Sequence, residues 1–511
     1  MRLLLQQLLS RYWVQRMPLA CLSKARAFQR TTTMTTSVGD PATSRDAQAR
    51  AFLHRLVELT QQELAYEASA TELLLSQCAP RVLERHGLAL AGLVVHSLSA
   101  GMGARTLVEI GRDPALANSS HEAGDKLLLP SGHTFRPGDL AAIVDNRGGG
   151  PDKKKKAAAA GKTKEGKGIQ GVVARVMRDR LVIAIDHRDD AQDDDSIDWP
   201  ERLSVLKLAN ASTFNRQIST LEHVLKDYVG QDDAQPPKKQ SELVSLLLGF
   251  ASLPKNYGEA RSSTRSFYDG SLNGSQRRAL EHALAEETRL ALVWGPPGTG
   301  KTSTLVECVR QLVINDKKRV LVCGASNLAV DNLLARLSKL SSAANATKDR
   351  EEEKDEAFRI PERPLRLTRL GHPARVMPEL VQKTLDVQSQ STNAAEVLSD
   401  VRTELDALLR DLQKGKVKGK ARGEAWKEVR NLRKEWRKRE GGVVRDVVQN
   451  AEVVLCTCHG AGGRQLANER FDVVIIDEAA QAVEPACWIP ILKADKLILV
   501  RRLASLDCLH R

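Results

Sequence analysis

The spacing of apolar residues along the chain changes twice, and each change marks a different kind of structure. Over residues 47–78 the apolar side chains recur every three or four positions, which predicts one long helix. From about residue 88 the pattern becomes a series of short β-like runs. Beyond about residue 271, nearly continuous apolar runs alternate with helical patterns. The sequence therefore predicts three regions that fold differently.

The middle region predicts a small β-barrel. Gly, Pro and Asp separate five apolar runs of strand length, which begin at Leu93, Thr106, Leu140, Gly171 and Arg180. A stretch rich in Gly, Ala and Lys over residues 148–167 interrupts these runs and predicts a disordered loop. A second helix is expected over residues 213–229. We expect the barrel and a stalk of two helices to form one domain, residues 47–230.

The last region predicts an α/β fold with a parallel sheet. Its strands are expected at apolar runs that are almost continuous, as burial on both faces requires: residues 290–294, 319–323, 453–456, 473–476 and 497–500. Residues 231–270 have the composition of a linker. We expect the sheet domain to consist of residues 271–345 and 441–500, with a helical insert over residues 376–440.

Composition adds charge to this pattern. The 511 residues carry a formal net charge of +13 that is concentrated in Lys/Arg runs, which favours an anionic partner such as nucleic acid. The eight cysteines show no paired CxxC spacing, so no structural zinc site is expected and a reducing compartment fits better than secretion. No apolar run approaches the ~20 residues that span a bilayer, so no membrane partner is expected.

Residues 1–46 form a leader of different character. Before Asp40 the chain has no acidic residue but several basic ones, which are Arg2, Arg11, Arg16, Lys24, Arg26 and Arg30. Such a composition is typical of a mitochondrial presequence. A disordered tail, or a start codon placed too early, is the alternative, since Met17 and Met34 offer later starts. The sequence leaves both interpretations open.

Residues 295–302 match the phosphate-binding pattern G-x-x-x-x-G-K-[ST] between an expected strand and an expected helix. Glycines let several backbone N–H groups point at one phosphate, and the helix N-terminus adds its dipole. Lys301 supplies a charge to the β- and γ-phosphates, and Thr302 offers a hydroxyl to Mg²⁺. We therefore predict that ATP and Mg²⁺ are held by Gly295, Pro296, Pro297, Gly298, Thr299, Gly300, Lys301 and Thr302.

Asp477 and Glu478 follow the apolar run at residues 473–476. Two carboxylates at the end of a strand beside a phosphate loop suit catalysis, in which Asp477 binds Mg²⁺ and Glu478 positions or deprotonates the attacking water. The alternative is a helix N-cap followed by an acidic first turn. With a phosphate loop upstream, we favour the catalytic interpretation.

Asp477-Glu-Ala-Ala-Gln481 resembles motif II of superfamily 1 helicases, in the group around the nonsense-mediated-decay helicase and immunoglobulin mu-binding protein 2. The resemblance implies that Gln481 lies at the nucleotide and that Gln276, in Leu-Asn-Gly-Ser-Gln, contacts the adenine edge. Residues 325–332 look like motif Ia, and residues 451–462 look like the next strand-binding motif, although Cys458-His459 replaces the usual small polar pair there. The resemblance thus implies nucleic-acid contacts by Ser326, Asn327, Thr457 and Gly460.

The order of regions is also similar to that group. There, a barrel on a helical stalk precedes the phosphate loop of a RecA-like domain, and a helical insert divides that domain. The resemblance covers about residues 47–500. AAA-type ATPases share the same phosphate-loop residues, but they place the Asp-Glu strand soon after the loop, whereas the whole expected insert separates Asp477 from Lys301 here. The helicase interpretation therefore fits better.

Residues 414–439 carry twelve Lys or Arg residues against three acidic ones, with Trp426 and Trp436 interleaved. They could grip a strand by neutralising phosphates and stacking bases. Equally, they could form a solvated helical hairpin with both tryptophans packed between its arms. The run at residues 153–156 predicts a solvated loop with loose attraction to nucleic acid.

After residue 500 the sequence departs from the helicase pattern. The resemblance calls for Gly-Asp and Gln-Leu-Pro-Pro, which sense the γ-phosphate, but residues 501–511 follow no such pattern. The expectation is a chain truncated before the second RecA-like domain, whose arginines complete the ATP site. A lone first domain is also expected to associate through its exposed partner face.

Two functional hypotheses follow. The first is an ATP-dependent 5′-to-3′ helicase acting on single-stranded or forked DNA or RNA, of which this chain is the N-terminal half. The second is a catalytically inactive fragment that binds nucleotide and single strands. The resemblance implies replication or ribosome-associated partners in nucleus and cytoplasm, whereas the leader points to mitochondria.

Overall fold

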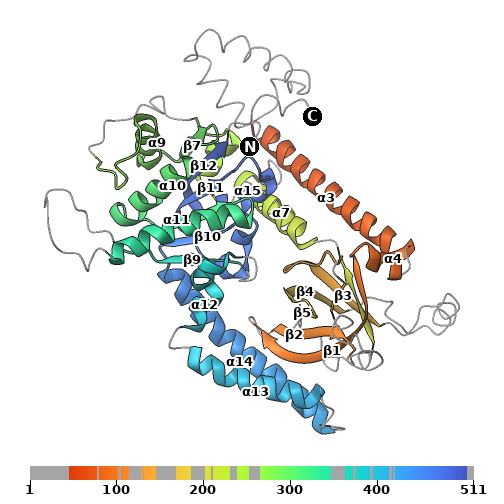
Figure 1. Ribbon diagram of the computed structural model, residues 1–511. Coiled ribbons are helices and arrows are strands. Elements are labelled where there is room, and N and C mark those ends of the chain that lie inside the picture. Colours follow the sequence, from red (N-terminus) through yellow and green to blue (C-terminus); the bar gives the residue numbers. More distant parts are fainter. Residues whose placement is uncertain are drawn as a thin grey trace. The chain divides into compact units, whose positions relative to one another are not determined.

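The computed structural model describes residues 45–77, 80–101, 105–113, 128–130, 132–145, 169–185, 202–208, 211–230, 239–252, 265–346, 363–371, 376–391, 395–413, 417 and 420–502. The leader before residue 45, the loop 148–167 and residues 503–511 of the tail lie outside these ranges. The chain divides into two compact units (Figure 1). One contains residues 64–212 and 368–451, and the other contains residues 1–63, 213–367 and 452–511.

The first unit contains a closed six-stranded barrel, as the sequence predicts. Neighbouring strands are antiparallel in the order β1-β2-β5-β4-β3-β6. Their side chains alternate between the barrel interior and the outside, most regularly in β2. The strands are β1 (Ala89–Gly101), β2 (Arg105–Arg112), β3 (Leu140–Asp145), β4 (Ile169–Val176), β5 (Arg180–Ile185) and β6 (Leu203–Lys207). Only β6 was not expected from the sequence.

Two long helices of the insert pack on this barrel. They are α13 (Ala395–Gln413) and α14 (Lys420–Asn450), and α12 (Leu385–Gln390) precedes them. Apolar residues of both long helices belong to the same buried cluster as the barrel interior. Two polar contacts join them to the barrel: the Ala100 amide donates to Asp406 at 2.6 Å, and Arg433 donates to the Thr106 hydroxyl at 2.7 Å. The insert therefore shares the core of the barrel.

This packing decides what the two insert tryptophans do. Trp436 is only 5% exposed and lies within the shared cluster, and Trp426 packs partly buried against it. The ring of Trp436 is therefore not free to stack on bases, and the ring of Trp426 is partly covered. The hairpin interpretation of residues 414–439 therefore holds for the two tryptophans, although they pack toward the barrel as well as between the helices. Exposed cations such as Lys427, Lys434 and Lys438 remain on the solvated side of α14.

The second unit is built on a six-stranded sheet in the order β7-β12-β11-β8-β10-β9. The pairs between β7, β12, β11, β8 and β10 are parallel, in agreement with the sequence. The five expected strands appear as β7 (Leu290–Gly295), β8 (Val320–Gly324), β10 (Val453–Thr457), β11 (Phe471–Asp477) and β12 (Ala494–Arg502). The short edge strand β9 (Leu367–Arg369) was not expected.

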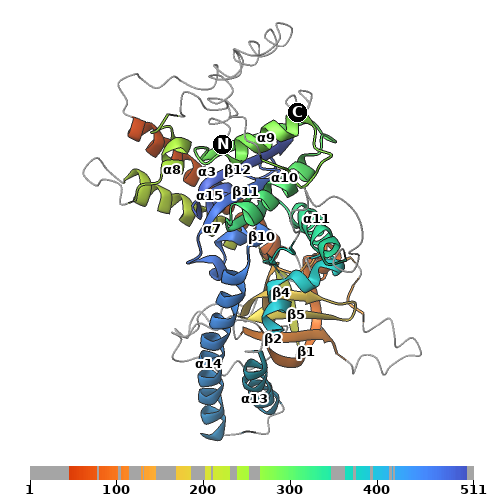
Figure 2. The same cartoon turned by 90° about the vertical axis from the view of Figure 1, so that its left-hand side faces the viewer.

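Helices cover both faces of this sheet. Figure 2 shows α10 and α11 side by side on one face, while α15 packs against β11 and β12 on the other. These helices are α9 (Gly274–Leu284), α10 (Lys301–Arg310), α11 (Asn327–Ala346) and α15 (Glu484–Ile491). Burial on both faces explains why the strands are nearly continuous apolar runs. Within the described residues, no helix is long and apolar enough to cross a membrane.

The remaining helices precede the sheet in the chain. The first is α3 (Arg45–Gln77), which matches the long predicted helix, and α4 (Pro80–Arg85) follows it. Helix α7 (Ala211–Val224) continues as a π-helical turn, η3 (Leu225–Val229), over the range of the second predicted helix. A short helix, α8 (Glu242–Leu248), is capped by Ser241, whose hydroxyl accepts from the Val244 amide.

The described cysteines are free and buried. Cys323 on β8 and Cys456 on β10 lie side by side in the sheet, with their sulfur atoms 3.7 Å apart. Burial raises the pKa of the Cys323 thiol well above its usual value. These thiols therefore act as small core side chains that are poor nucleophiles.

The shared core predicts that a change in α13 destabilises the barrel. Leu405 is fully buried between α13 and the barrel strands. We expect Leu405→Ala to lower the free energy of unfolding by about 2–5 kcal/mol, because it leaves a cavity. Urea denaturation of the full chain measures this, and hydrogen exchange should quicken in β1 and β2. The matched control is Glu404→Ala, an exposed neighbour on the same helix; equal stability of the two variants would contradict the shared core.

Candidate ATP and nucleic-acid site

The phosphate loop connects β7 to α10. Gly298 and Gly300 have φ angles of 81° and 76°, which L side chains rarely adopt. A Cβ atom on Gly300 would lie 2.5 Å from Nε2 of Gln276. Pro296, Pro297 and Thr299 are exposed around the turn. The loop thus has the glycine-dependent curl that brings backbone N–H groups close to a phosphate, and the residues present fit such a group.

Lys301 begins α10, and its ammonium group lies inside the curl. Its Nζ donates to the carbonyl oxygens of Gly295 and Pro296 at 2.8 and 2.7 Å. The Thr299 hydroxyl also donates to the Pro296 oxygen at 2.8 Å. These bonds hold the loop closed on itself and keep the lysine charge at its centre. Thr302, the next residue of the helix, is half-buried.

Gln276 connects helix α9 to the phosphate loop. Its Oε1 accepts from the Asn273 amide at 2.8 Å, and its Nε2 donates to the Thr299 oxygen at 3.1 Å. The Asn273 side chain accepts in return from the Gln276 amide, which makes a capping box. A carboxamide has two donors and two acceptor positions. As far as the described residues show, one N–H and one lone pair of Gln276 are left for a ligand.

Asp477 ends β11, two strands away from the phosphate loop in the sheet, and Glu478 follows it. Asp477 caps no helix, because α15 begins only at Glu484. The Asp477 carboxylate instead accepts from the Glu478 amide at 2.9 Å. Glu478 is 9% exposed and adopts a φ of 51°, and its carboxylate accepts from Gln481 at 3.4 Å. A buried glutamate in the left-handed region costs about 1–3 kcal/mol, which is typical of a functional site and not of a capping turn.

The strand between the loop and the acid pair is β12. Arg501 and Arg502 pair in register with Trp294 and Gly295 of β7. The Ala479 amide donates to the Val500 oxygen at 2.9 Å. The two arginines therefore end β12 between the phosphate loop and Glu478, at the place where the helicase pattern has Gly-Asp.

The predicted strand-binding residues gather at the ends of β8 and β10. Thr457 pairs in register with Gly324. The Cys458 amide donates to the Gly324 oxygen at 3.0 Å, which ties the two loops together. Ser326 is exposed, and its hydroxyl accepts from the Ala329 amide at 3.2 Å at the start of α11, whose first residue is Asn327. The Thr457 hydroxyl accepts from the Gly460 amide at 3.0 Å.

All these residues lie on one edge of the sheet. Because the strands are parallel, their carboxyl ends meet there, and Asp477 pairs in register with Gly324. The phosphate loop and the acid pair lie at the ends of β7 and β11, Gln276 bonds to the loop from α9, and the predicted strand contacts follow β8 and β10. One edge of the sheet can therefore bind a triphosphate and a nucleic-acid backbone at the ends of neighbouring β-strands.

Arg216 is a residue that the sequence did not single out. It lies on α7, and its Nη1 approaches both the carbonyl oxygen of His459 at 2.8 Å and the His459 Nε2 at 3.1 Å. The signal available in the sequence was Cys458-His459, which departs from the small polar pair of the helicase pattern. Nothing in the spacing of α7 indicated that an arginine would meet that histidine.

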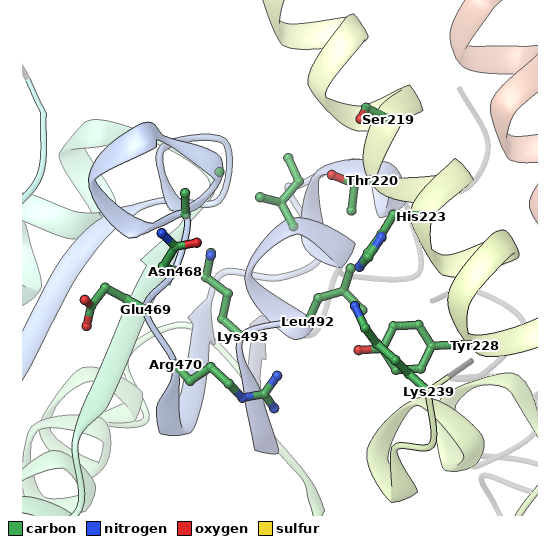
Figure 3. Close-up of a pocket in the computed structure, with 13 residues that line it drawn as sticks. Ser219, Thr220, His223, Tyr228, Lys239, Asn468, Glu469, Arg470, Leu492 and Lys493 are labelled. Carbon is green, nitrogen blue, oxygen red and sulfur yellow. The ribbon is translucent and has the colours of Figure 1, made fainter. Parts of the chain in front are cut away.

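A cavity of about 500 Å³ lies elsewhere in this unit (Figure 3). Part of its lining comes from residues that precede β11 and β12, so it opens at the amino edge of the sheet. His223, Tyr228 and Lys239 face it from one side, and Arg470 and Lys493 lie on the other. Most of its charges already have partners, in the pairs Lys239–Asp227, Glu469–Arg319 and Arg470–Asp495. It is not the nucleotide site.

Two protein families match the chain. The AAA domain family matches residues 271–500, and the family described as helicase SMUBP-2/HCS1, 1B domain, matches residues 53–208. These ranges coincide with the sheet and with the barrel together with most of α3.

Several curated proteins are similar over most of the chain. DNA polymerase alpha-associated DNA helicase A of Schizosaccharomyces pombe is 35% identical over 88% of the chain and 60% of its own length. DNA-binding protein SMUBP-2 of Mus musculus is 31% identical over 90% of the chain and 41% of its own length. A third relative, ATP-dependent helicase NAM7 of Saccharomyces cerevisiae, is 34% identical over 45% of the chain and 19% of its own length.

The chain thus spans only part of each of these relatives, from 19% to 60% of their length. Its similarity to the polymerase alpha-associated helicase nevertheless extends from the barrel through the sheet, as do the two family matches together. The chain belongs to the superfamily 1 helicases, in the group that contains SMUBP-2, the polymerase alpha-associated helicase and NAM7.

Proposed function

We propose that the chain provides the ATP-binding domain of an ATP-dependent helicase that moves 5′ to 3′ on DNA or RNA. The observation that carries the proposal is the shared edge of the sheet, where Asp477 and Gly324 lie on neighbouring strands. A structural change at the carboxyl end of β11, where the nucleotide would bind, would occur one β-strand away from the loops that would hold nucleic acid. The direction of movement rests on the helicase resemblance.

Each nucleotide residue has a role that its position supports. Thr302 and Asp477 would hold Mg²⁺, which neutralises charge on the phosphates. Lys301 now donates to two carbonyl oxygens at the centre of the loop. Phosphate oxygens are also acceptors, so oxygens of the β- and γ-phosphates would replace these carbonyl partners when ATP binds. Glu478 would accept a proton from the attacking water, and Gln481 holds the Glu478 carboxylate through a hydrogen bond.

The substrate that we propose is single-stranded or forked nucleic acid. Backbone amides and hydroxyls at Ser326, Asn327, Thr457 and Gly460 suit phosphate and sugar contacts, which carry no preference for base sequence. The names of the relatives include a DNA helicase and a DNA-binding protein, which supports DNA, whereas RNA as a substrate rests on the helicase resemblance. We accordingly propose replication or ribosome-associated machinery as partners, in the nucleus and cytoplasm.

A second candidate function is nucleotide-dependent strand binding without turnover. It is favoured by Arg501 and Arg502, which end β12 beside the phosphate loop where the helicase pattern has Gly-Asp. ATPase activity of the purified 511-residue chain separates the two candidates. Turnover that single strands stimulate supports the helicase, whereas tight ATP and strand binding with no turnover supports the second candidate. Duplexes with a 5′ or a 3′ tail then test the direction.

Two substitutions separate binding from hydrolysis. Lys301→Ala should weaken ATP binding at least about 10-fold, because one charge-assisted contact to phosphate is lost. Glu478→Gln should leave ATP binding within about 2-fold and lower strand-stimulated turnover about 10²–10⁴-fold, the usual contribution of general-base catalysis. Calorimetry with a non-hydrolysable ATP analogue and a phosphate-release assay measure the two effects. Unchanged turnover in Glu478→Gln would remove this residue from the proposed chemistry.

Gln276 should control the choice of base. Its remaining donor and acceptor match the N7 and N6 positions of adenine but are mismatched with guanine. We expect Gln276→Ala to reduce the preference for ATP over GTP about 10-fold, which corresponds to one lost hydrogen bond. Gln276→Glu is the matched variant, because it keeps an acceptor for the Asn273 amide and loses the donor. Competition between ATP and GTP for a fluorescent nucleotide measures both, and an unaltered preference in both variants would refute this role.

A further inference from the structure

The loop after β10, residues 457–463, is held from two directions. On one side, the Cys458 amide is bonded to Gly324 at the end of β8. On the other, Arg216 of α7 contacts His459. The arginine stem also lies close to the backbone, because a Cβ atom on Gly462 would be 2.5 Å from Arg216 Cδ. Glycine at 462 therefore makes room for the arginine.

The hydrogen bond defines the state of His459. A guanidinium only donates, so the His459 Nε2 accepts and the ring is neutral with its proton on Nδ1. Burial, and then the charge of Arg216, lower the pKa of His459 to about 4, which keeps it neutral at physiological pH. Both groups that Arg216 contacts are thus uncharged acceptors.

Arg216 itself carries a charge that the described residues leave uncompensated. It is half-buried, and burial lowers its pKa from the usual value. Among the described residues, no carboxylate forms an ion pair with it. A partly desolvated cation without a counter-ion is costly in a fold, and such groups are concentrated where a charged ligand binds. The candidate ligand surface that Arg216 contacts directly is the loop that holds His459.

We propose that Arg216 is a positioning residue of the nucleic-acid interface, which holds residues 457–463 in their strand-binding shape and whose charge is compensated by strand phosphate. This inference rests on the proposed function, since it requires that the loop contacts nucleic acid. It adds α7, an element outside the helicase motifs, to the machinery that binds the strand. The expected ligand group is a backbone phosphate of DNA or RNA, without base preference.

The test uses the full 511-residue chain and two titrations. Anisotropy of fluorescein-labelled oligothymidylate and oligouridylate, at several salt concentrations, measures strand affinity and its salt slope. A fluorescent ATP analogue measures the nucleotide site as an internal control. The variants are Arg216→Ala and Arg216→Lys. Lys226→Ala is the matched control, because Lys226 is an exposed cation further along the same helical segment.

We expect Arg216→Ala to weaken binding of both oligonucleotides about 10-fold or more and to lower the salt slope by about 1, while ATP affinity stays within about 2-fold. Arg216→Lys should keep the salt slope but recover only part of the affinity, because it retains the charge but replaces the rigid guanidinium, whose Nη1 meets both acceptors of His459, with a flexible ammonium group. Lys226→Ala should behave as the unmodified chain.

Three outcomes overturn the proposal. Strand binding by Arg216→Ala at unmodified affinity refutes it alone and leaves the proposed function standing. Equal losses of strand and ATP affinity in both Arg216 variants mean that Arg216 only maintains the fold. An unmodified chain that binds ATP but no oligonucleotide refutes the proposed function and this inference together.

Discussion

The parallel direction of five strands is the constraint on which the candidate site depends. In a parallel sheet every strand ends on the same edge, so residues far apart in the chain become neighbours if each follows its strand directly. Gly295, Gly324, Thr457 and Asp477 all end strands of this sheet. The long stretch of chain between Lys301 and Asp477, insert included, does not alter this placement. The sheet order alone sets which of these ends are adjacent.

That order puts β12 between the phosphate loop and the acid pair, and β8 next to the acid pair. The end of β12 therefore lies between the two elements of the proposed nucleotide site. In this chain the position holds Arg501 and Arg502. Two basic residues thus stand where the helicase pattern has Gly-Asp, which makes this strand end the main chemical difference from that pattern.

The sequence predicted those features that depend on local patterns. The five parallel strands followed from continuous apolar runs, and the phosphate loop from a motif in its required context. The capping alternative for Asp477 was settled only by the structure, because it depends on where the next helix starts. The strands β6 and β9 are too short for a periodic signal. The packing of Trp436 against the barrel and the contact of Arg216 with His459 each join segments that lie far apart in the chain, so no local pattern encodes them.

The composition of the loop after β10 explains why its support comes from outside. Residues 460–463 are Gly-Ala-Gly-Gly, so this half of the loop has no long side chain to hold its backbone. Glycine also has the largest conformational freedom to lose. Order must then come from neighbouring elements, and the Gly324 oxygen and the Arg216 guanidinium are two groups that supply it. For the strand binding that we propose, a cation suits the second position better than a neutral donor, because it fixes the loop backbone and would also attract a strand phosphate.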